Sequence, residues 1–145
     1  MTPIFAEIRA SDLSEWAKRA ESERWMPSLL RQLAVNSGAK LRTCRFLTHE
    51  ETNRPGWDGI IDAETSGFNV PAGWSAWELS KERAAKGKAN RDAAKRVRAT
   101  GEVKPAETTC VFVTLRVWPK KKLKKKWLSS GENKQAWGKQ QKKTG

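Results

Sequence analysis

Two acidic residues, Asp58 and Glu78, lie in or beside short apolar runs that are typical of buried strands. Asp58 follows Trp57 at the start of one run, and Glu78 lies between Trp77 and Leu79 in the next run. A buried carboxylate needs a partner, because the desolvation of an unpaired charge costs more free energy than its packing contributes. The two acids are therefore predicted to share one cation site.

Several lysines follow the second acid closely. Lys81 comes shortly after Glu78, and Lys86 and Lys88 lie in the basic stretch behind it. A hard cation such as Mg²⁺, or Mn²⁺ in its place, binds one or two carboxylates together with water and phosphate, and a nearby ammonium group stabilises the charge of a phosphoryl transition state. This pattern predicts a metal-dependent nuclease in which Asp58 and Glu78 bind the metal ion.

The sequence leaves a structural alternative open for each acid. Asp58 could form an Asx turn with Gly59, and Glu78 could pair with an arginine or a lysine and take no part in chemistry. Two further acids, Glu21 and Glu23, lie between the first two helical patterns and are expected to be solvated, although an acid there could also face the metal site.

The chain is strongly basic, with a formal net charge of +13, and much of the excess lies near its end. Residues 119–145 contain ten lysines and a single acid, Glu132. We therefore divide the chain into a domain over 1–118 and a lysine- and tryptophan-rich segment over 119–145. We expect DNA or RNA as the partner before a membrane surface, and the alternative is a solvated tail. The candidate nucleic-acid contacts are Lys86, Arg91, Arg96, Lys120, Lys121, Lys122, Lys124, Lys125 and Lys126.

The composition argues against other kinds of site and location. No apolar run reaches the roughly 20 residues of a membrane span. Residues 1–10 lack the features of a signal peptide, so a cytoplasmic protein is expected. Cys44 and Cys110 lie in strand-like runs and are predicted to be reduced and buried. A single histidine, His49, cannot form a zinc site with two distant cysteines.

Two helical patterns precede the acidic pair. Ser11 is predicted to be the N-cap of the first helix. The second pattern covers residues 25–34, with Pro27 in its first turn, and it ends at the polar residues 36–38. The tryptophans predicted to lie in the core are Trp16, Trp25 and Trp77.

The predicted strands cover residues 40–47, 57–64, 74–79 and 108–117, with a short edge strand over 4–10. Three of them form an antiparallel meander, and a basic helix over 81–99 then leads to a parallel, central last strand. Alternation turns Glu78 to the opposite face from Trp77 and Leu79, and it turns Lys81 away from Glu78. The expected fold class is α/β (α+β), with a small mixed sheet flanked by helices.

The phrases around the acids carry a family resemblance. The chain contains RPGWDG at 54–59, FNVPAGWSAWE at 68–78, KA at 88–89 and FVTLRVW at 112–118. These phrases resemble the PD-(D/E)xK restriction-endonuclease-like superfamily. More narrowly, they are similar to the nuclease-like domain at the front of large bacterial defence proteins that carry a STAND-type NTPase. The resemblance covers the chain from about residue 4 to residue 137.

The resemblance implies a restriction-endonuclease-like core and a Mg²⁺-dependent endonuclease that cleaves DNA as the effector of an antiphage defence system. It also implies a partner, the NTPase or sensor region of a longer protein. Relatives continue past the last shared tryptophan with another strand and helix, so this chain is expected to be a truncated or excised domain.

The superfamily usually has a lysine two positions after the Glu, where this chain has Ser80. In some members the lysine lies on the following helix instead, which makes Lys88, or Lys86, a better catalytic candidate than Lys81. The alternatives are a catalytically inactive relative that binds nucleic acid and a module that contacts the NTPase portion. An oligomer is compatible with each of these functions.

Overall fold

The computed structural model describes residues 8–47 and 56–116. Two helices come first, three strands follow, and a third helix leads through a short 3-10 turn into a last strand. The elements are α1 (Ala10–Ala17), α2 (Glu21–Val35), β1 (Lys40–Phe46), β2 (Gly59–Thr65), β3 (Gly73–Ser80), α3 (Ala85–Arg98), η1 (Pro105–Glu107) and β4 (Thr108–Thr114).

The four strands form one mixed sheet in the order β1-β2-β3-β4. β1, β2 and β3 pair antiparallel, whereas β3 and β4 are parallel. Parallel neighbours need a crossover connection, and α3 lies in that connection. The predicted meander and parallel pair are thus confirmed. The prediction of a central last strand is wrong, because among the described strands β4 pairs only with β3 and lies at the edge of the sheet. Most of its residues are half-buried, which explains its apolar composition.

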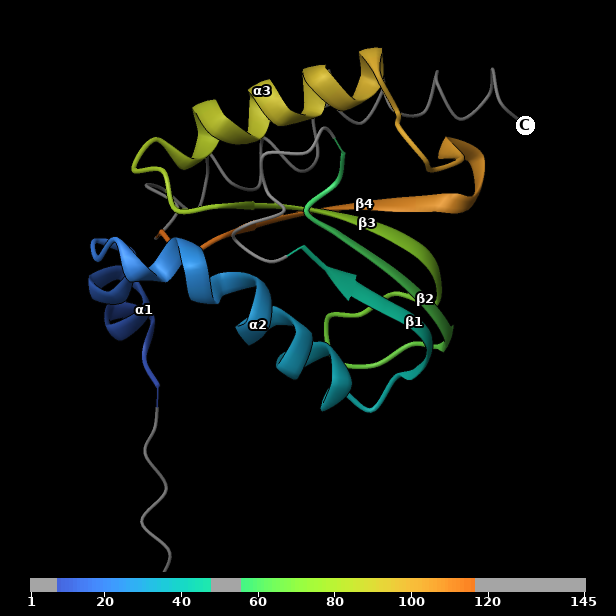
Figure 1. Ribbon diagram of the computed structural model, residues 1–145, viewed down its shortest axis with the longest axis horizontal. Coiled ribbons are helices and arrows are strands. Elements are labelled where there is room, and N and C mark those ends of the chain that lie inside the picture. The colour runs from blue at the N-terminus through green and yellow to red at the C-terminus, as the bar shows by residue number, and fades with distance from the viewer. Residues whose placement is uncertain (1–7, 48–55, 117–145) are drawn as a thin grey trace, which may run out of the picture.

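The helices cover the two faces of the sheet, with α2 on one face and α3 on the other (Figure 1). On the side of α2, Ile61 and Trp77 pack with Ala34 in one buried cluster. Ile60 and Ala76, one position away from them along β2 and β3, belong to a different cluster. Successive side chains in a strand point to opposite faces, so each of these two strands contributes to both sides of the sheet.

The predicted start of each N-terminal helix is wrong. α1 begins one residue before the predicted cap, Ser11, because the carboxylate of Asp12 accepts a hydrogen bond from the backbone N–H of Arg9 (2.8 Å) and stabilises an earlier first turn. α2 begins at Glu21, so Pro27 lies in its second turn. The acidic residues that precede the second apolar pattern therefore belong to the first turn of α2, where the helix dipole favours negative charge.

The described ends of two other predicted elements also differ from the sequence-based boundaries. α3 begins four residues later than the predicted start at residue 81. The edge strand predicted over 4–10 does not form in its described part, because residues 8 and 9 are irregular and residue 10 begins α1. No helix within the described ranges is long and apolar enough to cross a membrane.

The three tryptophans predicted for the core have different environments. Trp77 is buried, and Trp16 is half-buried against a small cluster that includes Ala17. Trp25 is 55% exposed, with the guanidinium of Arg24 lying 5.7 Å from its ring centroid, so its assignment to the core is wrong. Helical spacing alone did not reveal that Trp25 lies on the solvent-exposed face of α2.

Both cysteines are free thiols and are half-buried rather than fully buried. Burial raises the pKa of Cys44 above its ordinary value, and burial together with the charge of Glu78 raises the pKa of Cys110 to about 12. The thiol and not the thiolate therefore dominates at neutral pH, and both side chains behave as small hydrophobic groups.

Substitution of two glycines by alanine tests the packing, because we expect the two changes to shift the free energy of unfolding in opposite directions. A Cβ at Gly59 would overlap the ring of Phe46, whereas a Cβ at Gly87 would make only ordinary contacts in α3. We expect Gly59→Ala to lower the free energy of unfolding by about 1–3 kcal/mol through overpacking. Gly87→Ala should raise it by about 0.5–1 kcal/mol through helix propensity. Urea denaturation of both variants measures this, and a neutral Gly59→Ala would contradict the packing of β2 on β1.

Candidate functional site

A cleft of about 450 Å³ opens where β3 ends, between α2, the residues that precede β2 and α3. It brings together the four residues that the sequence proposes for catalysis, Asp58, Glu78, Lys81 and Lys88. Its full lining is Glu23, Met26, Pro27, Gly56, Asp58, Glu78, Leu79, Ser80, Lys81, Glu82, Lys88, Lys95 and Arg96.

Strand register brings the two acids side by side. In the antiparallel pair of β2 and β3, Gly59 is opposite Trp77. The next residues outward along the two strands are therefore Asp58 and Glu78. Directly opposite side chains on one face of such a pair have Cβ atoms about 4.5–5.5 Å apart. The acids thus lie on adjacent chain segments, as the sequence predicted, and at the same level of the sheet.

The carboxylate of Asp58 is fixed by the neighbouring strand. Its Oδ2 accepts a hydrogen bond from the backbone N–H of Leu79 (2.8 Å). The backbone carbonyl oxygen of Asp58 accepts another from the N–H of Leu47 (2.9 Å). The predicted alternative, an Asx turn with Gly59, is therefore wrong, because the carboxylate bonds across to β3. The other oxygen, Oδ1, takes no part in this hydrogen bond.

Glu78 is buried on the face of β3 that α3 covers, opposite to the face of Trp77, as alternation predicted. Its Oε1 accepts a hydrogen bond from Nε of Arg96, and the two side chains form a buried ion pair. The predicted pairing of Glu78 with an arginine is therefore confirmed. The pair also lines the cleft, so it does not separate Glu78 from the other site residues.

Arg96 corrects one of the predicted nucleic-acid contacts. It was expected on the basic outer face of the helix, yet its residue is only 4% exposed. Its Nη2 donates a hydrogen bond to the carbonyl oxygen of Gly56, and its guanidinium lies 4.7 Å from the ring centroid of Trp57. Arg96 therefore lies inside the site and not on the exposed face of α3.

Trp57 holds the segment that carries Asp58. Its ring is buried, and its Nε1 donates a hydrogen bond to the carbonyl oxygen of Thr100 (2.8 Å), just beyond the end of α3. With Arg96 against the same ring, the residues before β2 are tied to α3 at two points. This restricts the position of Asp58 relative to Glu78.

The electrostatics of the site favour a cation near Glu78. Burial, together with the charges of Asp58 and Asp92, raises the pKa of the Glu78 carboxyl to about 7, and Arg96 offsets part of this increase. Two other carboxylates thus act on Glu78, and the guanidinium of Arg96 offsets their effect on it only in part. A bound cation would favour the ionised form of Glu78.

The candidate lysines are both paired at the edge of the cleft. Lys88 Nζ lies 2.7 Å from Oδ1 of the buried Asp92, and Lys81 Nζ lies 3.4 Å from Oε2 of Glu23. Glu23 belongs to α2, which covers the opposite face of the sheet from Glu78, so Lys81 turns away from Glu78 as predicted, although both residues line the same cleft.

The sequence did not predict the ion-pair partners of Lys88 and Glu78, which are Asp92 and Arg96. Asp92 was not considered, and Arg96 was assigned to the surface. Lys88, Asp92 and Arg96 recur at intervals of four, which places them on one face of a helix. This spacing was the available signal. Glu23, expected to be solvated, has an exposed side chain but does line the cleft.

The remaining predicted contacts are exposed or not described. Arg91 is exposed and pairs with Glu82. The side chain of Lys86 and the lysines at 120–126 lie outside the part of the chain that the structure describes. The predicted division at 118 likewise falls outside it. Within residues 8–47 and 56–116, no group of three or more His, Cys, Asp or Glu side chains is arranged to hold a metal ion.

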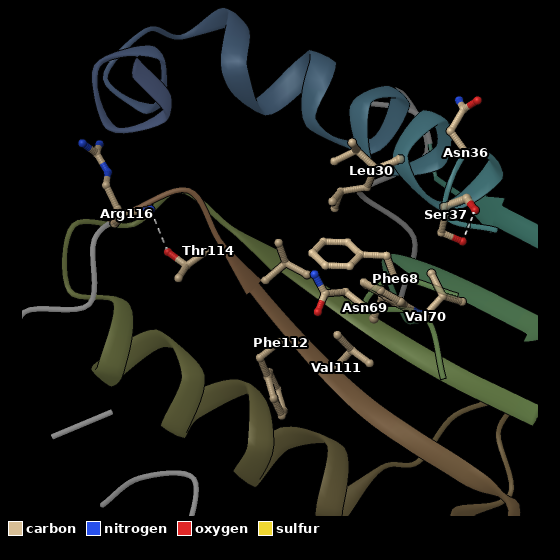
Figure 2. Close-up of a pocket in the computed structure, with 14 residues that line it drawn as sticks. Leu30, Asn36, Ser37, Phe68, Asn69, Val70, Val111, Phe112, Thr114 and Arg116 are labelled. Carbon is tan, nitrogen blue, oxygen red and sulfur yellow. Dashed lines mark hydrogen bonds between the residues drawn. The ribbon is translucent and has the colours of Figure 1, made fainter. Parts of the chain in front are cut away.

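A larger groove of about 840 Å³ lies between α2, the turn around Asn69 and β4 (Figure 2). Its lining is mostly apolar, with Leu30 from α2 and Val111 from β4 on opposite sides. Arg116 is its only charged lining residue among those described, and that side chain donates hydrogen bonds to the carbonyl oxygens of Lys81 (2.7 Å) and Ala17 (3.3 Å). The groove lacks the paired acids that make the smaller cleft the better candidate for chemistry.

The raised pKa of Glu78 predicts a pH dependence of stability. The folded protein binds the Glu78 proton more tightly than the unfolded chain does, so the free energy of unfolding should fall as pH rises from about 4.5 to about 7. One group contributes a slope of at most about 1.4 kcal/mol per pH unit. Urea denaturation across this range measures it, and Glu78→Gln should flatten the slope. An unchanged slope in that variant would show that other groups cause it.

Comparisons with known protein families, with curated proteins and with solved structures find no match to this chain. The assignment of a function therefore depends on the arrangement of the cleft and on the resemblance of the sequence phrases.

Proposed function

We propose that the protein is a Mg²⁺-dependent endonuclease that hydrolyses phosphodiester bonds in DNA at the cleft beside α3. One observation carries the proposal: two carboxylates from adjacent segments of the sheet, Asp58 and Glu78, line the same cleft as two lysines. Acids that bind a metal ion and cations that bind phosphate are the two requirements of this chemistry.

The donor set fits a hard divalent cation. Mg²⁺ prefers oxygen ligands and often takes only one or two carboxylates, with water and phosphate in its other positions. Asp58 and Glu78 would hold the ion, since each has an oxygen that the hydrogen bonds to Leu79 and Arg96 do not use. When bound, the ion would polarise the phosphate and activate a water molecule for attack. Mn²⁺ has the same ligand preference.

The residues of the chain have separate roles in this proposal. The backbone hydrogen bond from Leu79 orients the carboxylate of Asp58 before the ion arrives, which reduces the reorganisation needed for binding. Lys88 and Lys81 at the cleft edge would bind the phosphate oxygens and stabilise their charge. Ser80 also lines the cleft but cannot supply a positive charge, so a lysine from outside β3 takes that role.

The fold and the sequence phrases support the assignment to a restriction-endonuclease-like core. An antiparallel meander is followed by a helix and a parallel strand, which gives a small mixed sheet flanked by helices, as expected for such a core. The resemblance further supports a role as the DNA-cleaving effector of an antiphage defence system. The partner in that role would be an NTPase or sensor region of a longer protein. The lysines of residues 119–145 would add sequence-independent affinity for phosphate.

A second candidate function is a catalytically inactive module of the same fold that binds nucleic acid or protein. The ion pair between Arg96 and Glu78 favours it, because the guanidinium already neutralises one of the two acids. Ser80 in place of the usual lysine favours it as well. The two functions differ in whether a divalent cation enters the cleft.

Removal of either acid tests the proposed chemistry. We expect Asp58→Asn and Glu78→Gln each to abolish Mg²⁺-dependent cleavage of duplex DNA, because both carboxylates bind the same ion. The matched controls are Asp62→Asn and Glu64→Gln, whose acids lie on β2 and pair with Arg42 and Lys40. Gel assays with duplex and single-stranded DNA and RNA measure cleavage, and circular dichroism checks folding.

The outcomes separate the two candidate functions. Retained cleavage by a folded Asp58→Asn or Glu78→Gln protein would remove this cleft as the active site. If the wild-type chain binds DNA but cleaves no substrate with Mg²⁺ or Mn²⁺, the inactive module is the better assignment.

The two lysines should contribute unequally to cleavage. Lys88 extends from a helix turn beside Glu78 and is held by the buried Asp92, whereas Lys81 pairs with an exposed acid. We expect Lys88→Ala to lower the cleavage rate by about a hundredfold or more, as for removal of one charge-stabilising donor, and Lys81→Ala to cost much less. Single-turnover rates at fixed metal and salt concentrations measure both. The reverse ranking would assign the catalytic cation to Lys81.

A further inference from the structure

Arg96 occupies an unusual position for an arginine on a basic helix. Its residue is only 4% exposed, and its side chain contacts three groups: the carboxylate of Glu78, the carbonyl oxygen of Gly56 and the ring of Trp57. Gly56 and Trp57 immediately precede Asp58. The guanidinium therefore lies between the chain segments that carry the two proposed metal ligands.

The charges around Arg96 show what it does in the absence of a metal ion. Glu78 is buried, and strand register puts a second acid, Asp58, on the segment directly opposite. The guanidinium is the positive charge in direct contact with that carboxylate. A buried carboxylate without a cation is strongly destabilising, so Arg96 supplies the compensation that makes a metal-free site possible.

A divalent cation at the same carboxylate would meet this guanidinium. Nε of Arg96 already donates to Oε1 of Glu78, and a metal ion on this side chain would lie within a few ångströms of a like charge in a poorly solvated site. Like charges at such distances disfavour each other, and burial weakens the screening by water. Simultaneous binding of both cations to Glu78 is therefore unfavourable.

We propose that Arg96 is a built-in competitor of the metal ion, which binds Glu78 in the metal-free protein and is displaced from it when a divalent cation enters. The inference rests on the proposed function, since it takes Asp58 and Glu78 as ligands. The contacts with Gly56 and Trp57 do not involve Glu78, so they retain the displaced guanidinium at the site. Arg96 thus lowers the metal affinity while it stabilises the metal-free fold.

Binding of Mn²⁺, followed by electron paramagnetic resonance of the free ion, tests the competition without any measurement of cleavage. We expect Arg96→Gln to bind Mn²⁺ about tenfold more tightly than the wild-type chain, because a neighbouring like charge is removed. The same variant should be less stable without metal and should gain more thermal stability from Mn²⁺. The matched control is Arg98→Gln, which removes an exposed arginine from the same helix and should leave Mn²⁺ binding unchanged.

A measurement on the wild-type chain keeps the test decisive if Arg96→Gln does not fold. The arginine Nε–H resonances are recorded by ¹⁵N-correlated NMR during a titration with Mg²⁺, and Arg96→Lys identifies the signal of Arg96. We expect this signal to move toward the position of an exposed arginine as Mg²⁺ binds. A signal that stays in place while Mg²⁺ binds would overturn the competition.

The outcomes distinguish the two levels of the proposal. Unchanged or weaker Mn²⁺ binding by a folded Arg96→Gln protein, with binding still lost in Glu78→Gln, would overturn the competition alone and make Arg96 a residue that positions Glu78 for the ion. Mn²⁺ binding that is absent, or that Glu78→Gln leaves intact, would overturn the metal site itself and the proposed function with it.

Discussion

The buried ion pair between Arg96 and Glu78 is the interaction on which the site depends. It joins α3 to β3, and the additional contacts of Arg96 with Gly56 and Trp57 join both to the segment before β2. Removal of one member of a buried pair commonly costs about 3–5 kcal/mol, because the other charge remains buried without compensation. A whole domain is stable by only about 5–15 kcal/mol, so loss of one partner alone would remove a large share of that stability. The fold therefore requires both members of the pair that organises the proposed active site.

The position of this pair follows from strand alternation. Trp77 points into the cluster under α2, so its neighbour Glu78 must point toward α3, which carries Lys88 and Arg96 on one face, eight residues apart. Antiparallel register then brings Asp58 to the level of Glu78. Lys81 follows the end of β3 and pairs with Glu23 of α2, so it lines the same cleft from the side of the other helix. The alternating side chains of β3 thus face an apolar cluster on the side of α2 and charged residues on the side of α3.

Local patterns predicted the strands and the meeting of the two acids, because both depend on periodicity and on neighbouring segments. The features that the sequence did not reveal depend on how elements are rotated and placed. The burial of Arg96 requires knowing which face of α3 meets the sheet, and the exposure of Trp25 requires the same knowledge for α2. The edge position of β4 depends on which strands pair, which an apolar run does not specify. The spacing of Lys88, Asp92 and Arg96 at intervals of four could have predicted which face of α3 meets the sheet. That prediction would have required knowing that Glu78 lies beneath this face.

A crystal structure of the protein soaked with Mn²⁺, with the ion located by its anomalous scattering, tests the central claim most directly. The account predicts one ion bound by an oxygen of Asp58 and an oxygen of Glu78, at metal–oxygen distances of about 2.1 Å. It also predicts that Nε of Arg96 no longer contacts Glu78 in that state. An empty cleft at saturating Mn²⁺, with the Arg96–Glu78 pair intact, would contradict the account and leave the ion pair as a purely structural feature.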